Sequence, residues 1–282
     1  MPELPEVEVL VRHLAPRLQG RRILEATVHR ARGVRPQTVQ QMTAALQGAT
    51  LESVSRRGKY LCFGVRSEQG ASLSCVGHLG MTGRMYLQPL MAPLPKHAVV
   101  TWRFADARFV YEDVRGFGRL NLDTTPIAAL GSEPFDCSWT AERLLERLGN
   151  SRQPIKVKLL DQHLIAGVGN IYASEALHQA GISPRRPSGR LGLKDAAALL
   201  QAVKSVLSRA IELGSRATLD FKSGGDGLFY YGSSAELEGV PIVERFDVYD
   251  RAGEPCRRCG AVIRRTVQAQ RSTYHCPQCQ RR

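Results

Sequence analysis

The first six residues, Met1-Pro2-Glu3-Leu4-Pro5-Glu6, place two carboxylates close to a proline that directly follows the initiator methionine. Removal of Met1 turns Pro2 into a free secondary amine, and an N-terminal amine titrates near neutral pH. Such an amine can attack electrophilic carbon, while a neighbouring carboxylate can act as general acid or base. The alternative is an ordinary helix start with Pro5 in its first turn and no catalytic role. Taken alone, these six residues favour that alternative.

The strongest single motif is a cysteine pattern near the C-terminus, Cys256-x-x-Cys259, then sixteen residues, then Cys276-x-x-Cys279. Two such pairs match the spacing of a four-cysteine zinc ribbon, in which each pair forms a tight knuckle. Four thiolates complete a tetrahedron around the ion, so the predicted Zn²⁺ is structural and not catalytic. Two disulfides are the alternative, which a reducing compartment disfavours.

The 282-residue chain carries 39 Lys plus Arg against 26 Asp plus Glu, a formal net charge of +13. Residues 251–282 hold eight arginines and one glutamate, so more than half of the excess lies at this end. This charge points to an acidic partner such as nucleic acid. No apolar run is long enough to span a membrane. Cys62, Cys75 and Cys137 suit buried free thiols in a cytoplasmic protein.

These residues must be positioned by an α+β multidomain fold. Apolar residues at helical spacing from Leu4 to Leu14 predict a helix over about residues 3–18, which would anchor the reactive terminus. Short β-rich runs between about residues 21 and 125 predict a β-sandwich or flattened barrel.

The second half of the chain reads as mainly helical until the cysteine motif. Residues 126–150 look like a connector, Leu191–Leu213 predicts an amphipathic helix, and residues 214–247 suit a glycine-rich loop. We expect three domains: a catalytic helix and β-sandwich domain over residues 1–130, a helical domain with a loop over residues 131–247, and a zinc finger over residues 248–282.

Three stretches in the β-rich part combine cations, glycines and apolar tips. Residues 56–60 put three cations at the start of a strand, which suits phosphate contacts or, about equally, a solvated strand end. Residues 78–84 form a glycine-bracketed turn whose Met81 could wedge into a base stack or simply pack. Residues 113–118 repeat the arrangement with Arg115 and Phe117, where an Asp–Arg structural pair is the ordinary alternative.

A glycine turn precedes another predicted helix in the second half. Gly167-Val168-Gly169 leads into a helix that we expect Asn170 to cap. The free backbone N–H groups at such a helix start would suit a phosphate. A plain connection between two helices is the alternative.

The proline-glutamate start, the glycine turn before Asn170 and the terminal four-cysteine ribbon together resemble the formamidopyrimidine-DNA glycosylase family of helix-two-turn-helix DNA glycosylases. The resemblance covers essentially the whole chain, with the motifs in the same order. It implies an N-terminal helix with a β-sandwich, a helix-two-turn-helix domain and a zinc-ribbon hairpin with one structural Zn²⁺. It further implies a monomer that acts on damaged double-stranded DNA in the bacterial cytoplasm, at the nucleoid.

The resemblance also implies a mechanism. The Pro2 amine attacks the sugar of an oxidised purine nucleotide such as 8-oxoguanine or a formamidopyrimidine, displaces the base and forms a Schiff base. Glu3 handles protons, and β,δ-elimination then cuts the DNA on both sides of the lesion. Lys59 matches the family lysine associated with the first elimination, and Arg271 the ribbon arginine associated with the second.

By the same resemblance, a set of residues contacts the DNA around an extruded nucleotide. Arginine faces the orphaned cytosine, phenylalanine wedges the stack, and the others fill the gap or contact the backbone. The matching residues are Met81, Arg115 and Phe117 for the gap, and His97, Arg152, Lys156 and Asn170 for the backbone.

The chain departs from the family pattern near the expected lesion pocket. Ala98-Val99 follows His97 where many relatives carry a further Asp-His, residues 214–218 differ from the usual pattern, and the loop between Asp226 and Val248 is longer than usual. Two alternatives stay open: an endonuclease VIII-like activity on oxidised pyrimidines, and a non-catalytic protein that binds damaged DNA. Intact Pro2, Glu3 and Lys59 argue against the second.

Overall fold

The computed structural model describes residues 2–215, 236–237, 240–241 and 246–281 of the chain. Contacts divide the chain into two units. The first holds residues 1–129 and 214–242, and the second holds residues 130–213 and 243–282, so the helices between residues 141 and 213 share one unit with the cysteine ribbon. The predicted three-domain division at residues 130 and 247 stays a prediction.

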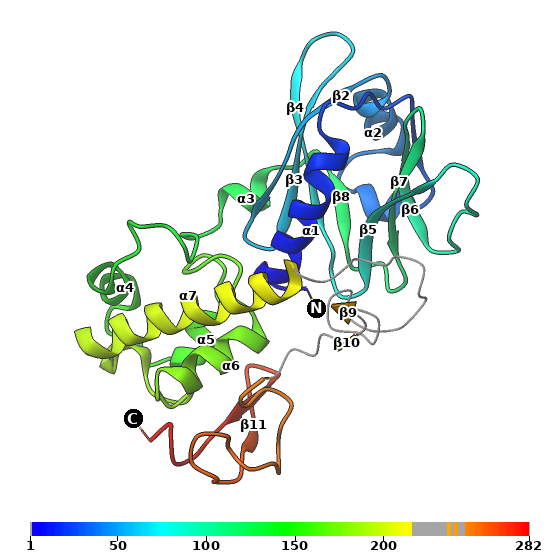
Figure 1. Cartoon of the computed structure of the whole chain (residues 1–282). Coiled ribbons are helices and arrows are strands. Elements are labelled where there is room, and N and C mark those ends of the chain that lie inside the picture. The colour runs from blue at the N-terminus through cyan, green and yellow to red at the C-terminus, as the bar shows by residue number, and fades with distance from the viewer. Residues whose placement is uncertain (1, 216–235, 238–239, 242–245, 282) are drawn as a thin grey trace. The chain divides into compact units, whose positions relative to one another are not determined.

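The first unit begins with α1 (Leu4–Leu18), which confirms the predicted first helix (Figure 1). Its apolar face, including Val7 and Leu14, is fully buried in the core of this unit. The helix ends at Leu18, because the next residue, Gln19, adopts extended backbone angles. The burial of this face fixes the start of the chain against the sheets behind it.

Two four-stranded antiparallel sheets form the predicted β-sandwich of the first unit (Figure 1). Strands with alternating burial, such as β3, turn one face toward the core and the other outward. One sheet has the order β2 (Thr50–Arg57), β3 (Tyr60–Arg66), β4 (Ser72–His78) and β8 (Arg119–Asn121); the other has the order β1 (Glu25–Val28), β6 (Ala98–Arg103), β7 (Ala107–Asp113) and β5 (Gly83–Pro89).

Three aromatic side chains join the two sheets in the core. Phe63 of β3 lies 5.1 Å from Trp102 and 5.8 Å from Phe109, both of the other sheet, measured between ring centroids. Trp102 and Phe109 stack at 4.4 Å. Such edge-to-face and stacked pairs add about 0.5 to 1.5 kcal/mol each beyond the burial of area. Cys75 is buried nearby, as predicted, but the prediction was wrong for Cys62, which is half-buried, and for Cys137, which is exposed.

Short elements connect the strands, and one of them contradicts an all-β interpretation of this region. α2 begins after Thr38, whose Oγ1 accepts the Gln41 backbone N–H at 3.1 Å, while the Gln41 side chain accepts the Thr38 N–H at 2.9 Å. This capping box was readable in the sequence. The other short elements of the first unit are η1 (Ala31–Val34), α2 (Val39–Leu46), α3 (Thr125–Ala128), and the two paired strands β9 (Glu236–Leu237) and β10 (Val240–Pro241).

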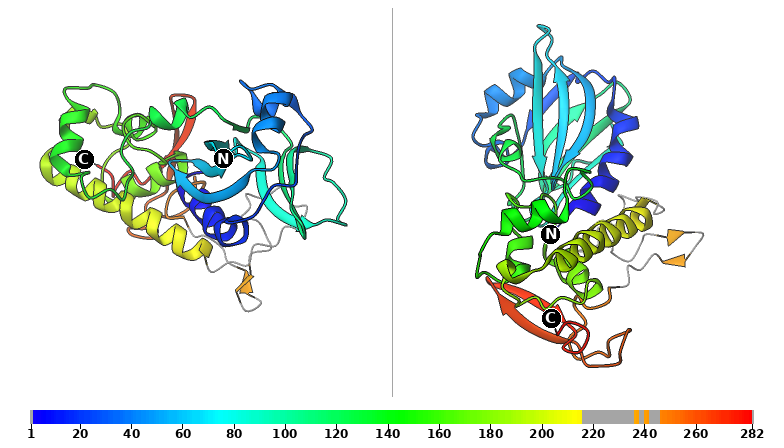
Figure 2. Two further views of the ribbon diagram at one scale, coloured as in Figure 1. Left: turned by 90° about the horizontal axis from the view of Figure 1, so that it is seen from above. Right: turned by 90° about the vertical axis from the view of Figure 1, so that its left-hand side faces the viewer.

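The second unit is built from helices and one hairpin. The predicted amphipathic helix at Leu191–Leu213 is present, displaced by two residues, whereas the expected connector 126–150 contains two helices. Figure 2 shows α7 as the longest of them. The elements are α4 (Ala141–Leu148), α5 (Ile155–Leu159), α6 (Asn170–Gln179), the short η2 (Ser188–Arg190), α7 (Leu193–Ser215), and the hairpin strands β11 (Arg264–Gln268) and β12 (Arg271–His275).

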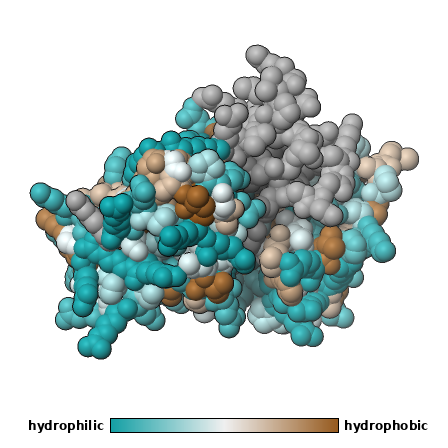
Figure 3. Space-filling model, turned by 90° about the horizontal axis from the view of Figure 1, so that it is seen from below, coloured by the Kyte–Doolittle hydropathy of each residue, from teal (hydrophilic) through white to brown (hydrophobic). Residues whose placement is uncertain are grey.

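On the face shown in Figure 3, hydrophilic side chains cover most of the coloured surface and hydrophobic ones gather in small groups. Among the helices that the structure describes, none combines the length and apolar character needed to cross a membrane.

Substitution of Phe109 by alanine tests the aromatic joint between the sheets. Phe109 is fully buried, so we expect F109A to lower the free energy of unfolding by about 3 to 5 kcal/mol. M91A is the matched control, because Met91 is 95% exposed and should change that free energy by less than about 0.5 kcal/mol. Urea unfolding followed by tryptophan fluorescence measures both, and equal losses would contradict this account of the core.

Candidate functional site

The start of the chain is buried and hydrogen-bonded. Pro2 is buried, and Glu3, the residue before α1, is 2% exposed. Its backbone N–H donates to Glu6 Oε2 at 2.6 Å, one of the two hydrogen bonds of a capping box. Chain termini usually fray unless something ties them down. The predicted nucleophile and its neighbouring carboxylate are therefore held in place, while Met1 lies outside the described residues.

The turn between β2 and β3 carries Lys59 and is tied to α1. Lys59 is 6% exposed and follows Gly58, whose φ of +55° is a conformation that glycine tolerates. The Arg56 guanidinium donates to Glu8 Oε2 at 2.8 Å and to the Gly58 carbonyl at 3.0 Å. Arg56 thus links α1 to the backbone beside Lys59, a positioning role that sequence analysis did not assign.

Glu8 is the carboxylate through which this link reaches α1. Burial raises the pKa of Glu8, but hydrogen bonds from Arg56 and Arg12 outweigh it, so the pKa lies below its usual value. The bond to Arg12 measures 2.9 Å. Glu8 is therefore charged at neutral pH and stabilises the folded state in that form.

His78 lies at the end of β4, close to the Lys59 turn. Its ring centroid is 4.8 Å from that of Tyr60, and its Nδ1 accepts the Gly80 backbone N–H at 3.1 Å. Burial and the charge of Lys59 lower the pKa of His78 to about 4. The ring is therefore neutral at physiological pH with its proton on Nε2. Sequence analysis treated this residue only as part of a turn.

The two glycine-rich turns meet through their backbones. A side chain at Gly80 would place its Cβ 2.6 Å from the Gly118 nitrogen, and the φ of Gly80 is +63°. Met81 and Phe117, on these two turns, are among the exposed large apolar side chains. The fold therefore brings the predicted gap-filling residues onto adjoining turns.

A buried carboxylate shapes the second turn. Asp113 Oδ1 accepts from Thr82 Oγ1 at 2.6 Å and from the Arg115 backbone N–H at 3.2 Å, and Oδ2 accepts from the Gly118 N–H at 2.7 Å. The sequence of residues 113–118 suggested an Asp–Arg side-chain pair as the ordinary alternative. Asp113 instead holds the backbone of its own turn, and the Arg115 guanidinium lies 4.9 Å from the centre of the Phe117 ring.

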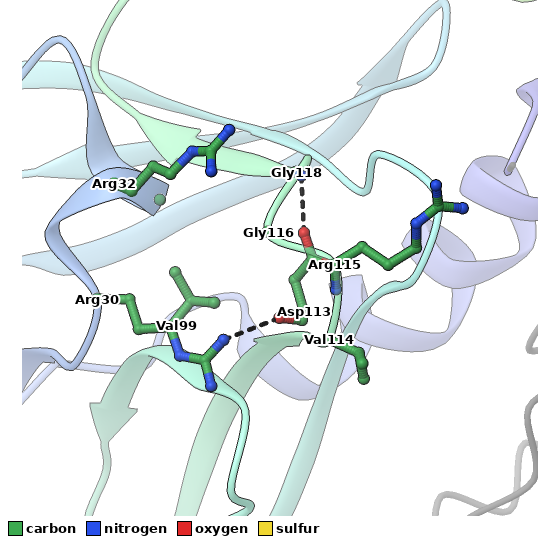
Figure 4. Close-up of a pocket in the computed structure, with 9 residues that line it drawn as sticks. Arg30, Arg32, Val99, Asp113, Val114, Arg115, Gly116 and Gly118 are labelled. Atoms are coloured by element: carbon green, nitrogen blue, oxygen red, sulfur yellow. Dashed lines mark hydrogen bonds between the residues drawn. The ribbon is translucent and has the colours of Figure 1, made fainter.

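A cavity of about 220 Å³ borders this turn, with Arg30 and Arg32 on one wall and Arg115 on the turn itself (Figure 4). Arg30 donates to the Asp113 carbonyl at 3.3 Å, and its Nη2 lies 2.8 Å from His97 Nδ1. A guanidinium has donors only, so Nδ1 accepts and the proton of a neutral His97 ring sits on Nε2. Arg30 was missed because only tertiary structure joins it to His97.

The second unit holds its own predicted residues around a buried lysine. Lys156 is fully buried, and its Nζ donates to Asn170 Oδ1 at 2.7 Å, Ser272 O at 2.9 Å and Thr273 Oγ1 at 2.7 Å. Asn170 Nδ2 also donates to Ser272 O, at 3.0 Å. Lys156 therefore fastens the start of α6 to the hairpin, and its contact with DNA stays a prediction.

One sequence prediction about α6 was wrong. Asn170 is the first residue of the helix, and the N-cap is Gly169. The Asn170 side chain is engaged by Lys156 and by Ser272, so it does not cap the helix. Arg152, before α5, is exposed.

The hairpin presents Arg271 at the first position of β12, next to its two-residue turn. Ala269 and Gln270 form that turn with φ values of +46° and +59°, the left-handed pair that matches the twist of a hairpin. Arg271 is exposed there and pairs with Gln268 in the ladder. The hairpin therefore fixes the position from which the Arg271 side chain extends into solvent.

The four predicted cysteines converge. Their Sγ atoms all lie within 4.8 Å of one another, with Cys256 to Cys279 at 3.9 Å and Cys259 to Cys276 at 3.4 Å. Four thiolates about 2.3 Å from one ion would have such separations, so the donor set fits tetrahedral Zn²⁺. Upstream of this cluster, Glu175 of α6 accepts the backbone N–H groups of Asp247, Val248 and Tyr249 at 2.8 to 2.9 Å.

Comparisons with known proteins match three family profiles along the chain. "Formamidopyrimidine-DNA glycosylase N-terminal domain" matches residues 1–120, "Formamidopyrimidine-DNA glycosylase H2TH domain" residues 130–222, and "Zinc finger found in FPG and IleRS" residues 253–282. The formamidopyrimidine-DNA glycosylase of Alkalilimnicola ehrlichii is 40% identical over 294 residues, with 100% of both chains covered.

Two solved structures of Lactococcus lactis Fpg are also similar to this chain. A mutant bound to a Fapy-dG-containing DNA has a TM-score of 0.83 and 34% identity, and covers 100% of both chains. The wild-type protein bound to an oxidised-pyrimidine-containing DNA has the same TM-score, identity and coverage.

Replacement of Glu8 by glutamine tests the link between α1 and the Lys59 turn. We expect E8Q to lower the free energy of unfolding at pH 7 by about 1 to 2 kcal/mol, because charge-assisted hydrogen bonds are lost. The pKa of Glu8 is lowered in the folded state, so this difference should hold above the ordinary value of 4.5 and shrink as the pH falls below it.

Urea unfolding of wild type and variant at pH 7 and pH 3.5 measures the effect. E52Q is the matched control, because Glu52 pairs with Arg66 on the exposed end of the same strand pair and should contribute at most about 0.5 kcal/mol. Equal effects of E8Q and E52Q, or an E8Q effect that does not change with pH, would contradict the assignment.

Proposed function

This chain belongs to the formamidopyrimidine-DNA glycosylase family, and we propose that its nucleophile is the amine of Pro2. The chain is a DNA repair enzyme with DNA glycosylase activity and lyase activity at abasic sites. The observation that carries the Pro2 proposal is the immobilised start of the chain, where Pro2 and Glu3 are buried and the Glu3 N–H is bound by Glu6. An amine held in this way loses little freedom when it attacks.

The reaction follows from these two residues. The Pro2 nitrogen attacks the anomeric carbon of the damaged nucleotide, the bond to the base breaks, and the sugar opens to a Schiff base. The Glu3 carboxyl group transfers protons during base loss and ring opening. The resulting iminium withdraws electrons, so successive β- and δ-eliminations cleave the two phosphodiester bonds.

Charged residues of each unit bind phosphate groups of the DNA. Lys59, held in its turn by Gly58 and Arg56, neutralises the phosphate beside the lesion during the first elimination. Arg271, exposed on the hairpin, binds the phosphate released in the second. Further backbone contacts come from His97, Arg152 and Asn170, with Lys156 holding Asn170 in position.

The exposed turns of the first unit fill the gap that the extruded nucleotide leaves. Met81 and Phe117 present apolar tips on adjoining turns, and apolar wedges of this kind insert between base steps. Arg115 lies over the Phe117 ring and would face the orphaned cytosine, whose base edge it can contact by hydrogen bonds. Asp113 holds the backbone of this turn through its hydrogen bonds to the N–H groups of Arg115 and Gly118.

The chain carries one structural zinc ion in its C-terminal ribbon, bound by the four cysteines. The ion cross-links the two knuckles and so stabilises the hairpin that presents Arg271. All four donors are protein thiolates, which leaves the zinc without an open position for catalysis.

We propose that the substrates are nucleotides with oxidised purines opposite cytosine. The complex of Lactococcus lactis Fpg with a Fapy-dG-containing DNA supports it. A second candidate is oxidised pyrimidines, because the same Lactococcus protein is also known with an oxidised-pyrimidine-containing DNA. The unusual residues 214–218 motivate this candidate, but residues 216–218 and most of the long loop lie outside the described residues.

We place the enzyme in the bacterial cytoplasm, as a monomer.

Borohydride trapping tests the proposed nucleophile. Protein with Met1 removed, as verified by mass, is mixed with a duplex that bears one 8-oxoguanine opposite cytosine. We expect a covalent adduct that maps to the Pro2 peptide, together with a one-nucleotide gap in the untrapped reaction. P2L should lose the adduct, because a large second residue also keeps Met1 in place. P5A keeps the amine and serves as the control.

The same assay on an abasic-site duplex separates the outcomes. Trapping there without reaction at 8-oxoguanine would keep the Pro2 nucleophile and move the lesion class toward oxidised pyrimidines. No adduct on either duplex would overturn the Pro2 proposal and favour a protein that binds damaged DNA without cutting it.

Removal of zinc should act on DNA binding before it acts on the first unit. We expect a strong chelator to weaken binding of an abasic-site duplex at least tenfold, because the hairpin with Arg271 depends on the cysteine cluster. Fluorescence anisotropy measures the affinity, and amide hydrogen exchange compares residues 2–129 with residues 246–281. Equal loss of protection in both segments would contradict this expectation.

A further inference from the structure

His178 reaches from α6 to the cysteine cluster. It lies in the last turn of α6 and is 3% exposed. Its Nε2 is 3.5 Å from Cys256 Sγ, and both side chains are buried. The four cysteines already supply four donors, so His178 stands outside the ligand set and contacts one of the ligands.

The surroundings of the ring decide which nitrogen carries the proton. Within the described part of the chain, the Nδ1 atom of His178 is buried and has no hydrogen-bond partner. A proton on Nδ1 would leave a buried donor unsatisfied and would aim the Nε2 lone pair at an anionic sulfur. The unsatisfied Nδ1–H and the lone pair facing the sulfur are both unfavourable. The proton therefore belongs on Nε2, where the thiolate accepts it.

N–H donors stabilise a four-thiolate zinc site, because they reduce the negative charge on its sulfur atoms. Four thiolates and one Zn²⁺ leave two negative charges in a partly buried place, and N–H donors to sulfur spread this charge. The backbone N–H of Cys279 donates to Cys276 Sγ at 3.4 Å and serves one ligand in this way. His178 serves Cys256 from a different element of the unit.

We propose that His178 donates its Nε2–H to the Cys256 thiolate and thereby couples zinc retention to the docking of the ribbon on α6. The ribbon segment, residues 247–281, also binds α6 at three further points, one of which is a hydrogen bond from the Arg258 guanidinium to the Gln179 carbonyl at 3.5 Å. Asn170 at the first turn donates to Ser272 O, and Glu175 in the middle accepts three backbone N–H groups. Among these contacts, the one made by His178 involves a zinc ligand. It therefore couples the binding of zinc to the contact between the ribbon and α6, the helix that begins with Asn170.

The rate of zinc release measures this role without reference to activity. Zinc-loaded full-length protein is mixed with a colorimetric chelator, and the release of the ion is followed by absorbance. H178F keeps the ring volume and removes the donor, so we expect release 10 to 100 times faster than in wild type. H178Q keeps a terminal N–H donor and should release zinc at close to the wild-type rate.

Q179A is the matched control, because it alters the same helical turn without a contact to sulfur. Release from Q179A should equal that of wild type. Wild-type release from H178F would overturn the proposal. Equally fast release from H178Q and H178F would also overturn it, because the ring would then act by filling space and not by donating a hydrogen bond.

Cobalt substitution gives a second readout, which remains decisive if H178F fails to fold. Loss of a hydrogen bond to a thiolate raises the energy of the sulfur electrons, so the sulfur-to-Co²⁺ charge-transfer band should move to longer wavelength. A small variant, H178A, is compared with H178Q and with wild type. The proposal requires the shift in H178A and its reversal in H178Q, and an unshifted H178A band would refute it.

Discussion

The burial of the first residues of the chain is the constraint on which the rest of the first unit depends. The proposed Pro2 nucleophile requires an N-terminal amine that is both chemically free and fixed in position. The apolar face of α1 supplies the fixation by packing into the sandwich core, and Glu6 binds the Glu3 N–H at the helix start. Because carboxylates are costly to bury without donors, Glu3 and Glu6 hold their positions only while the helix start stays intact.

Buried charged side chains organise the other functional segments in the same way. Asp113 binds two backbone N–H groups of its turn, Glu175 binds three at the beginning of the ribbon segment, and Lys156 binds three acceptors between α6 and the hairpin. Irregular segments have few backbone partners of their own. A single charge with several hydrogen bonds gives them one conformation, and its removal would leave several polar groups unsatisfied at once.

Local patterns made much of this architecture predictable. The apolar spacing in α1 and α7, the β-rich runs of the sandwich and the paired cysteines all act over short distances in sequence. Contacts between distant residues were not predictable in the same way: Arg30 with His97, Glu175 with residues 247–249, and His178 with Cys256 join separate elements. The Asn170 cap failed for a related reason, because a tertiary partner occupies a side chain whose type alone favours capping.

The two-residue turn of the hairpin has a consequence for how the sequence can vary. Ala269 and Gln270 both adopt left-handed angles, which cost residues with a Cβ about 1 to 2 kcal/mol each. Their strain is tolerable only because the ladder on both sides fixes the turn. An insertion of one residue would shift the register and turn Arg271 to the opposite face of the ribbon. The length of this turn therefore determines the face of the ribbon on which Arg271 lies.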